Sequence, residues 1–147
     1  MATERRAQVT WQGDLMSGSG TIETVGSGAF GPLEVTWASR AEKPEGRTSP
    51  EELIAAAHAA CFSMALSHGL AQQGHAPESL SSTATVTFVP GTGITKSVLD
   101  VEGNVPGVDD GAFREAAEDA KENCPVSQAL KGNVELELNA RLLTGAS

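Results

Sequence analysis

The stretch SPEELIAAAHAACFSMALSHGLAQQG, residues 49–74, decides how this chain folds. No Asp, Glu, Lys or Arg occurs in residues 53–77, and an uncharged run of this length is normally buried. Ser49 is the expected helix N-cap, followed by a proline at the first helical position and by Glu52 three residues later, as in a capping box. Gly74 is the expected stop. The stretch therefore predicts a central helix of about six turns at 3.6 residues per turn.

The two cysteines of the chain lie at positions where a thiol could be reactive. Cys61 lies near the middle of the predicted helix, inside or at the edge of the core. Free cysteine is also one of the most buried residue types, so an inert thiol is an equally good interpretation from position alone. Cys124 lies where one predicted helix ends and another begins, and the positive end of a helix dipole favours a thiolate. Its motif, Cys-Pro-Val-Ser, has the spacing of a CxxC motif with serine in the second position, although it comes too late in the chain for a thioredoxin-type site.

The first third of the chain predicts strands and turns. Residues 5–12, 20–25 and 33–38 are short segments rich in β-branched or aromatic residues, and glycines separate them. Hairpin turns explain these glycines better than a dinucleotide-binding fingerprint, because no strand–turn–helix unit follows. The charged segment 40–48 is expected to be an exposed loop that leads into the central helix.

The second half predicts a hairpin, one or two helices and a last strand. Residues 81–89 and 94–101 alternate in polarity on either side of a Pro-Gly turn. Residues 108–123 predict a helix capped by Asp109 or Asp110, with its core face formed by Phe113, Ala116, Ala117 and Ala120.

A short helical turn over residues 125–131, ended by Gly132, comes before a strand over residues 134–142. This order of elements predicts a mixed α+β fold, with helices packed against largely antiparallel sheet. The length of 147 residues predicts a single domain over residues 1–147.

The overall charge excludes some partners. The chain has 19 Asp and Glu against 10 Lys and Arg, and no cluster of four or more basic residues. This argues against nucleic acid as a partner, because binding to a phosphate backbone requires clustered positive charge. The first residues lack the apolar core of a secretory signal, so we expect a cytoplasmic protein. The helix of residues 49–74 contains two histidines and several Ser and Gln, which favours a soluble core helix over a membrane span.

A reactive Cys61 would need a positive charge nearby, because burial in an apolar helix raises the pKa of a thiol. Spacing alone does not choose among the candidates, which are Arg40, Arg47, Arg5, Arg6 and His58. Glu51 could favour the helix dipole, or it could turn inward and orient an arginine through a bidentate pair. The histidines and cysteines follow no standard zinc spacing, so we expect no metal and no bound cofactor.

At these residues the chain resembles the OsmC/Ohr family of thiol-dependent hydroperoxide reductases. The resemblance rests on SPEELIAAAHAACFSMAL around Cys61 and on NCPVSQAL around Cys124, and it extends in element order over nearly the whole chain. The HAACF form, and an arginine at Ser39-Arg40 just ahead of the central helix, are similar to the OsmC branch. One departure is Ala41, because family members often have an aromatic residue after this arginine.

The resemblance implies an OsmC-like fold, an intertwined homodimer and two active sites built from both chains. It implies that Cys61 is the peroxidatic thiol, Cys124 the resolving thiol, Arg40 the partner of the thiolate and Glu51 the carboxylate that orients the arginine. Organic hydroperoxides would be the substrate, and an external dithiol, either a small molecule or a lipoyl protein, would be the reductant.

An apolar pocket around the Cys61 thiol, lined by Phe62, Met64 and residues of the second subunit, is expected to favour alkyl hydroperoxides over hydrogen peroxide. The alternative is a non-enzymatic protein, either a redox sensor or a module that binds a small hydrophobic ligand. Both readings need an accessible Cys61, and only the resolving role of Cys124 separates them.

Overall fold

The predicted central helix is present as α2 (Pro50–Gln72) in the computed structural model, which describes residues 2–143. By its contacts the chain divides into two compact units, residues 1–53 and 54–147. The single domain predicted from chain length stays a prediction.

The N-terminus of α2 is capped as its sequence indicates, with one difference. The backbone N–H of Glu52 donates to the Ser49 hydroxyl at 3.1 Å, so Ser49 is the cap. The carboxylate of Glu52 accepts a hydrogen bond from the hydroxyl of Thr48 at 2.7 Å. The predicted cap bond from Glu52 to Ser49 is therefore confirmed, whereas the return bond from the Glu52 carboxylate to Ser49 stays a prediction.

The C-terminus of α2 ends at the predicted glycine. Gly74 has a φ of +86°, which a residue with a Cβ rarely adopts. Its N–H donates to the carbonyl of Ala71 at 3.0 Å, and the N–H of His75 donates to the carbonyl of Leu70 at 2.9 Å. These two bonds form a Schellman motif, which satisfies carbonyls that the end of the helix leaves free.

The first unit contains a three-stranded antiparallel sheet in the order β1 (Val9–Gln12), β2 (Ser19–Ile22) and β3 (Leu33–Val35). All three strands were predicted. The third ends three residues early, because a short helix, α1 (Trp37–Ala41), begins there. The prediction of strand through residue 38 is wrong for this reason.

The start of α1 also corrects the predicted loop over residues 40–48. The side-chain oxygen of Thr36 accepts from the N–H of Ser39, and that of Ser39 accepts from the N–H of Thr36, both at 3.0 Å. This reciprocal capping box begins the helix that carries Arg40. At the other end of the segment Thr48 is buried and forms a bridge with Val35, so the segment is not an exposed loop throughout.

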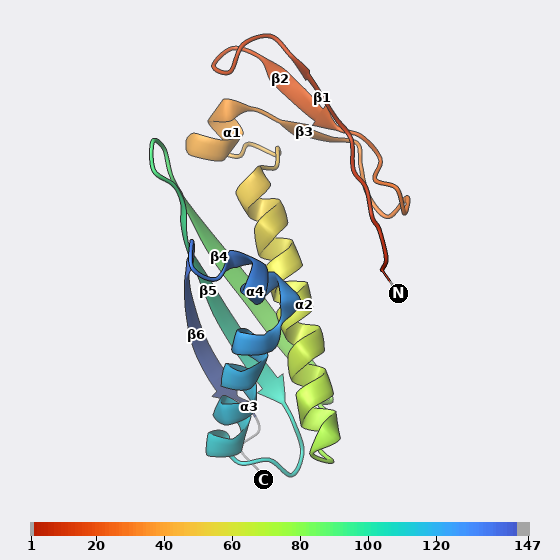
Figure 1. Cartoon of the computed structure of the whole chain (residues 1–147), viewed down its shortest axis with the longest axis vertical. Coiled ribbons are helices and arrows are strands. Elements are labelled where there is room, and N and C mark those ends of the chain that lie inside the picture. Colours follow the sequence, from red (N-terminus) through yellow and green to blue (C-terminus); the bar gives the residue numbers. More distant parts are fainter. Residues whose placement is uncertain (1, 144–147) are drawn as a thin grey trace. The chain divides into compact units, whose positions relative to one another are not determined.

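The second unit contains a three-stranded sheet in the order β4 (Ser79–Val89), β5 (Gly93–Asn104) and β6 (Glu135–Leu142). β4 and β5 form the predicted antiparallel hairpin, whereas β6 pairs with β5 in parallel. A parallel partner requires a crossover connection. Here that connection contains α3 (Asp110–Asn123) and α4 (Pro125–Leu130), and α3 contacts β6 (Figure 1).

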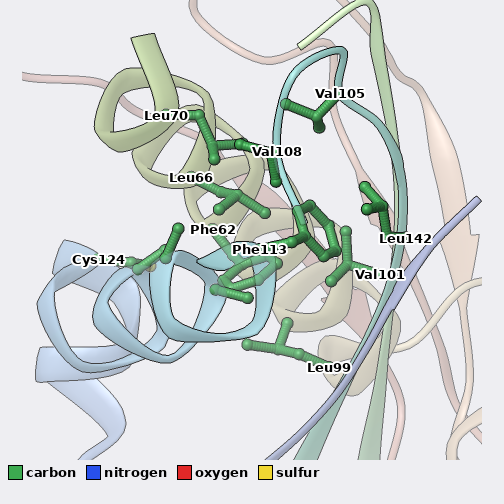
Figure 2. Packing of buried hydrophobic residues seen from close by; sticks show 13 residues of the cluster. Phe62, Leu66, Leu70, Leu99, Val101, Val105, Val108, Phe113, Cys124 and Leu142 are labelled. Carbon is green, nitrogen blue, oxygen red and sulfur yellow. The ribbon is translucent and has the colours of Figure 1, made fainter. Parts of the chain in front are cut away.

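The core of the second unit lies between α2, α3 and the sheet. Figure 2 shows these side chains meeting, with Phe62, Leu66 and Leu70 from α2 facing Phe113 of α3. Gly103 of β5 allows the Phe113 ring to approach, because a Cβ at this position would lie 2.6 Å from ring carbons. The α+β class is thus confirmed, as is the predicted core face of α3.

Only one side of α2 is buried, contrary to what its composition indicates. In its most apolar 18-residue window, 22% of the residues are buried. Among the described residues, α2 is the one helix that is long and apolar enough to cross a membrane, judged by length and composition alone. The core of a soluble protein can contain such a helix as well, so this finding is weak evidence for a membrane span. The side that remains uncovered needs its own explanation.

Candidate functional site

In the first unit, Arg40 of α1 is held by a carboxylate at the start of α2. The Arg40 Nε lies 3.2 Å from Glu51 Oε1 and 3.0 Å from Oε2, and its Nη2 lies 2.9 Å from Oε2. Glu51 is buried, whereas the Arg40 side chain keeps about a third of its surface exposed. A bidentate pair of this kind fixes the plane of the guanidinium. The directions of its other N–H groups are then fixed as well, because they lie in the same plane.

Arg40 lines an apolar cavity of about 350 Å³ in the same unit. Three layers of this unit contribute to its wall: the β1–β2 hairpin, the β3–α1 connection and the first turn of α2. The lining residues are Val9, Trp11, Leu15, Ile22, Val35, Thr36, Trp37, Arg40, Pro50 and Leu53. An arginine beside an otherwise apolar cavity is suited to a ligand with one polar or anionic end and one hydrocarbon end.

In the second unit, both cysteines are free thiols. The two thiols interact, and this interaction affects the pKa of Cys61. Burial raises the pKa of the Cys61 thiol above its ordinary value. The backbone N–H of Val126 donates to the Cys61 sulfur and lowers the pKa, whereas the neighbouring Cys124 thiol raises it. Within the described residues of this unit no cation contributes, so the unit by itself keeps Cys61 protonated at neutral pH.

Cys124 lies at the predicted junction between two helices. It is the C-cap of α3 and the N-cap of α4, and its sulfur accepts a hydrogen bond from the N–H of Ser127 at 3.5 Å. The first turn of α4 therefore directs two backbone N–H groups at sulfur, that of Val126 toward Cys61 and that of Ser127 toward Cys124. At Cys61 this donor favours the thiolate and lowers the pKa.

His58, a candidate for the missing cation, is wrong for that role. Its ring is fully buried between Ser97 Oγ, 2.7 Å from Nδ1, and Ser127 Oγ, 2.8 Å from Nε2. Burial lowers the pKa of His58 below its ordinary value of 6.5, so the ring is neutral at pH 7. A neutral imidazole has one N–H donor and one acceptor nitrogen, and the two serines can satisfy both.

The other candidate cations have exposed settings. Arg47 pairs with Glu34 at 3.1 Å, and both side chains are at least 40% exposed. Arg5 and Arg6 lie in an exposed stretch of the first unit. Arg40 is therefore the candidate arginine that a buried carboxylate orients.

Phe62 is fully buried in the core of the second unit, and Met64 is 73% exposed. The pocket that these two residues would form around the thiol with a second subunit stays a prediction. In residues 2–143 no group of three or more His, Cys, Asp or Glu is arranged to hold a metal ion.

Sequence reasoning missed two groups of residues. The cavity wall of Trp11, Leu15 and Trp37 had no signal, because these residues come together only when the strands fold back. Ser97 and Ser127 were missed as partners of His58, although Ser127 belongs to the Cys-Pro-Val-Ser motif.

The chain is similar to known proteins over most of its length. The family model described as OsmC-like protein matches residues 43–139. Peroxiredoxin OsmC of Escherichia coli (strain K12) is 43% identical over 140 residues, which cover 93% of this chain and 96% of that protein. The organic hydroperoxide resistance protein-like 1 of Staphylococcus saprophyticus is 34% identical over 106 residues, covering 67% of this chain and 72% of its own.

A solved structure gives the same result for the fold. The organic hydroperoxide resistance protein OhrB of Bacillus subtilis superposes with a TM-score of 0.67 at 27% identity, covering 92% of this chain and 98% of the other. The family model and the identity to the relatives agree with this superposition. The chain belongs to the OsmC family, and its identity to the Escherichia coli peroxiredoxin places it in the OsmC branch.

Proposed function

We propose that the protein is a thiol-dependent peroxidase that reduces organic hydroperoxides to alcohols, with Cys61 as the peroxidatic thiol and Cys124 as the resolving thiol. The observation that carries this proposal is the pairing of two free thiols at the first turn of α4. Two thiols in mutual contact can pass from dithiol to disulfide without a large rearrangement. The relatives named above are a peroxiredoxin and hydroperoxide resistance proteins.

The reaction proceeds in three balanced steps. The Cys61 thiolate attacks one peroxide oxygen, the O–O bond breaks, and the alkoxide leaves and takes a proton to become the alcohol. Cys61 is now a sulfenic acid. The Cys124 sulfur attacks the Cys61 sulfur, the S–S bond forms and the S–O bond breaks, and water leaves with the proton of the Cys124 thiol. An external dithiol, either a small molecule or a lipoyl protein, reduces the disulfide through a mixed disulfide and is itself oxidised.

Arg40 is proposed as the cation that stabilises the Cys61 thiolate, and Glu51 as the carboxylate that orients it. Within the described residues of its own unit, Cys61 has a raised pKa that no cation lowers. Arg40, by contrast, is held in a fixed plane by a buried carboxylate. A positive charge close to a thiol lowers its pKa by about 1–3 units.

The apolar cavity beside Arg40 is proposed to receive the hydrocarbon part of the peroxide. A tertiary alkyl group gains free energy by leaving water for such a cavity, at about 25 cal/mol per Å² of apolar surface. Hydrogen peroxide has no such group. We therefore expect kcat/KM for a tert-alkyl hydroperoxide to exceed that for hydrogen peroxide by at least about tenfold, which corresponds to ~1.4 kcal/mol.

The assay measures peroxide consumption with dithiothreitol as reductant. No consumption of either peroxide would remove the proposed function and favour a sensor or a binding module. Equal rates with both peroxides would leave the activity in place and contradict the role of the cavity.

A homodimer is proposed from the uncovered side of α2, and the cytoplasmic location expected from the sequence stays a proposal. This side contains five exposed residues at helical spacing, of which His68 is polar and the other four are small or apolar, namely Ala57, Ala60, Met64 and Ala71. An exposed apolar stripe on a helix indicates a partner surface. A second copy of the chain covers such a stripe by the same stripe across a twofold axis, and the two active sites are then built from both chains.

A charge on this stripe should prevent the dimer. Met64→Glu places a carboxylate where a Met side chain loses its water on association, so the Kd for dimerisation should rise at least about a hundredfold, or ~3 kcal/mol. Sedimentation equilibrium measures this Kd. The matched control is Ala112→Glu, which adds the same charge at an exposed position of α3 and should leave the dimer unchanged. A Met64→Glu protein that dimerises as wild type does would contradict the assignment of this surface.

A further inference from the structure

The buried ring of His58 is unexplained by the reaction described above. Its exposed surface is zero, as is that of Ser97, and Ser127 is 1% exposed. Burying three polar side chains in a core costs free energy unless they satisfy each other. These three do so, through the bonds of 2.7 and 2.8 Å to the two ring nitrogens. The cluster joins α2 to β5 on one side and to α4 on the other.

The spacing of the chemistry-bearing residues on the two helices is the same. His58 and Cys61 are three residues apart on α2, so they lie on one face one turn apart. Cys124 and Ser127 are likewise three residues apart, at the N-cap and the third position of α4. His58 bonds Ser127, and Cys61 contacts Cys124. The two helices thus meet at two matched contacts, one between polar side chains and one between sulfurs.

We propose that His58 is a positioning residue, which holds Ser127 and through it the first turn of α4, so that Cys124 stays in register with Cys61 for disulfide formation. This inference rests on the proposed function for its biological meaning. It concerns the second chemical step and not the attack on peroxide.

Register matters because a disulfide has narrow geometry. The Cβ atoms must come within about 3.5–4.5 Å, with a C–S–S–C dihedral near 90°. A rotation of α4 by a fraction of a turn would move the Cys124 sulfur relative to that of Cys61. Holding two reacting groups in place raises their effective concentration, which is the quantity that a lost positioning contact lowers.

The chain offers a matched pair of substitutions. Ser127→Ala and Ser97→Ala each remove one buried hydroxyl and leave one nitrogen of His58 without its partner. Only Ser127 belongs to α4. A merely structural role of His58 predicts the same loss of stability in both variants and the same thiol chemistry.

The measurement is the equilibrium between the Cys61–Cys124 disulfide and the dithiol in a glutathione redox buffer, with unfolding in urea measured alongside. We expect the effective concentration of the two thiols to fall about tenfold in Ser127→Ala, equivalent to ~30 mV for a two-electron couple. In Ser97→Ala the effective concentration of the two thiols should change by less than about twofold. Equal changes in both variants, or no change in Ser127→Ala, would overturn the inference.

A second pair of substitutions keeps the test decisive if a serine variant does not fold. The amide of His58→Gln can replace Nε2 and keep the bond to Ser127, whereas that of His58→Asn can replace Nδ1 and keep the bond to Ser97. The glutamine variant should retain the effective concentration, and the asparagine variant should lose it. The opposite order would overturn the inference.

The redox equilibrium does not depend on peroxide, so the two proposals fail separately. If Ser127→Ala and Ser97→Ala differ as expected but the protein consumes no hydroperoxide, the positioning role of His58 is supported and the peroxidase function is contradicted. A protein that consumes hydroperoxide with unchanged Ser127→Ala chemistry would keep the peroxidase and lose the positioning role.

Discussion

Replacing Cys61 with serine should lower the consumption of organic hydroperoxide by at least about a thousandfold, or ~4 kcal/mol in the barrier. The hydroxyl of serine is not ionised at neutral pH and cannot form the sulfenic acid on which the later steps depend. The variant should fold, because serine is close to cysteine in size and Cys61 is only half-buried. Consumption is followed with a tert-alkyl hydroperoxide and dithiothreitol.

Cys124→Ser is the control that separates the two thiols. It should lose turnover but still oxidise one Cys61 per subunit, which a single-turnover experiment detects as a trapped sulfenic acid by mass spectrometry. Since Cys124 raises the pKa of Cys61, its removal should not slow this first oxidation. Undiminished turnover in Cys61→Ser would overturn the assignment of the peroxidatic thiol, and undiminished turnover in Cys124→Ser would overturn that of the resolving thiol.

Replacing Arg40 with methionine should slow the oxidation of Cys61 at pH 7 by about a hundredfold. Loss of one preorganised charge at a reacting centre typically costs 10²–10³ in rate. Burial already raises the pKa of Cys61, so without the arginine the thiolate should form only at higher pH. The midpoint of the rate against pH should therefore move upward by about 1–3 units.

Arg47→Met is the matched control, because this arginine also pairs with a glutamate but at an exposed site. Exposed ion pairs contribute about 0–1 kcal/mol to stability. We therefore expect Cys61 in the Arg47→Met variant to be oxidised at a rate within about twofold of the wild-type rate. Glu51→Gln should give a smaller loss than Arg40→Met, since the charge remains and only its orientation is relaxed. An unchanged pH midpoint in Arg40→Met would mean that another cation ionises Cys61.

Much of the candidate site could be predicted from the sequence. The pairing of Arg40 with Glu51 was expected from resemblance, and the structure forms it with three close contacts. The location of Cys124 between two helices was expected from the proline that follows it, and it is correct. The sequence left His58 as one of five candidate cations, because its nearness to Cys61 along the helix gives no information on what surrounds its ring.

The sequence by itself determined α2 and α3. Ser49 and Gly74 set the ends of α2, and Asp109 caps α3, through contacts with backbone groups three to five residues away. Such signals are local, so they can be recognised in the sequence. The same rule shows why α1 could have been found, since Thr36 and Ser39 form its capping box within four residues.

Only the tertiary structure decided the contacts between distant segments. His58 bonds Ser97 and Ser127, which are 39 and 69 positions away in the sequence. β6 pairs in parallel with β5, although two helices come between them in the chain. Local propensity carries no information about either contact, because each depends on how separate elements pack to bury a shared apolar surface. The pairing of the two thiols is of this kind: the sequence supplied both cysteines, and packing brought them together.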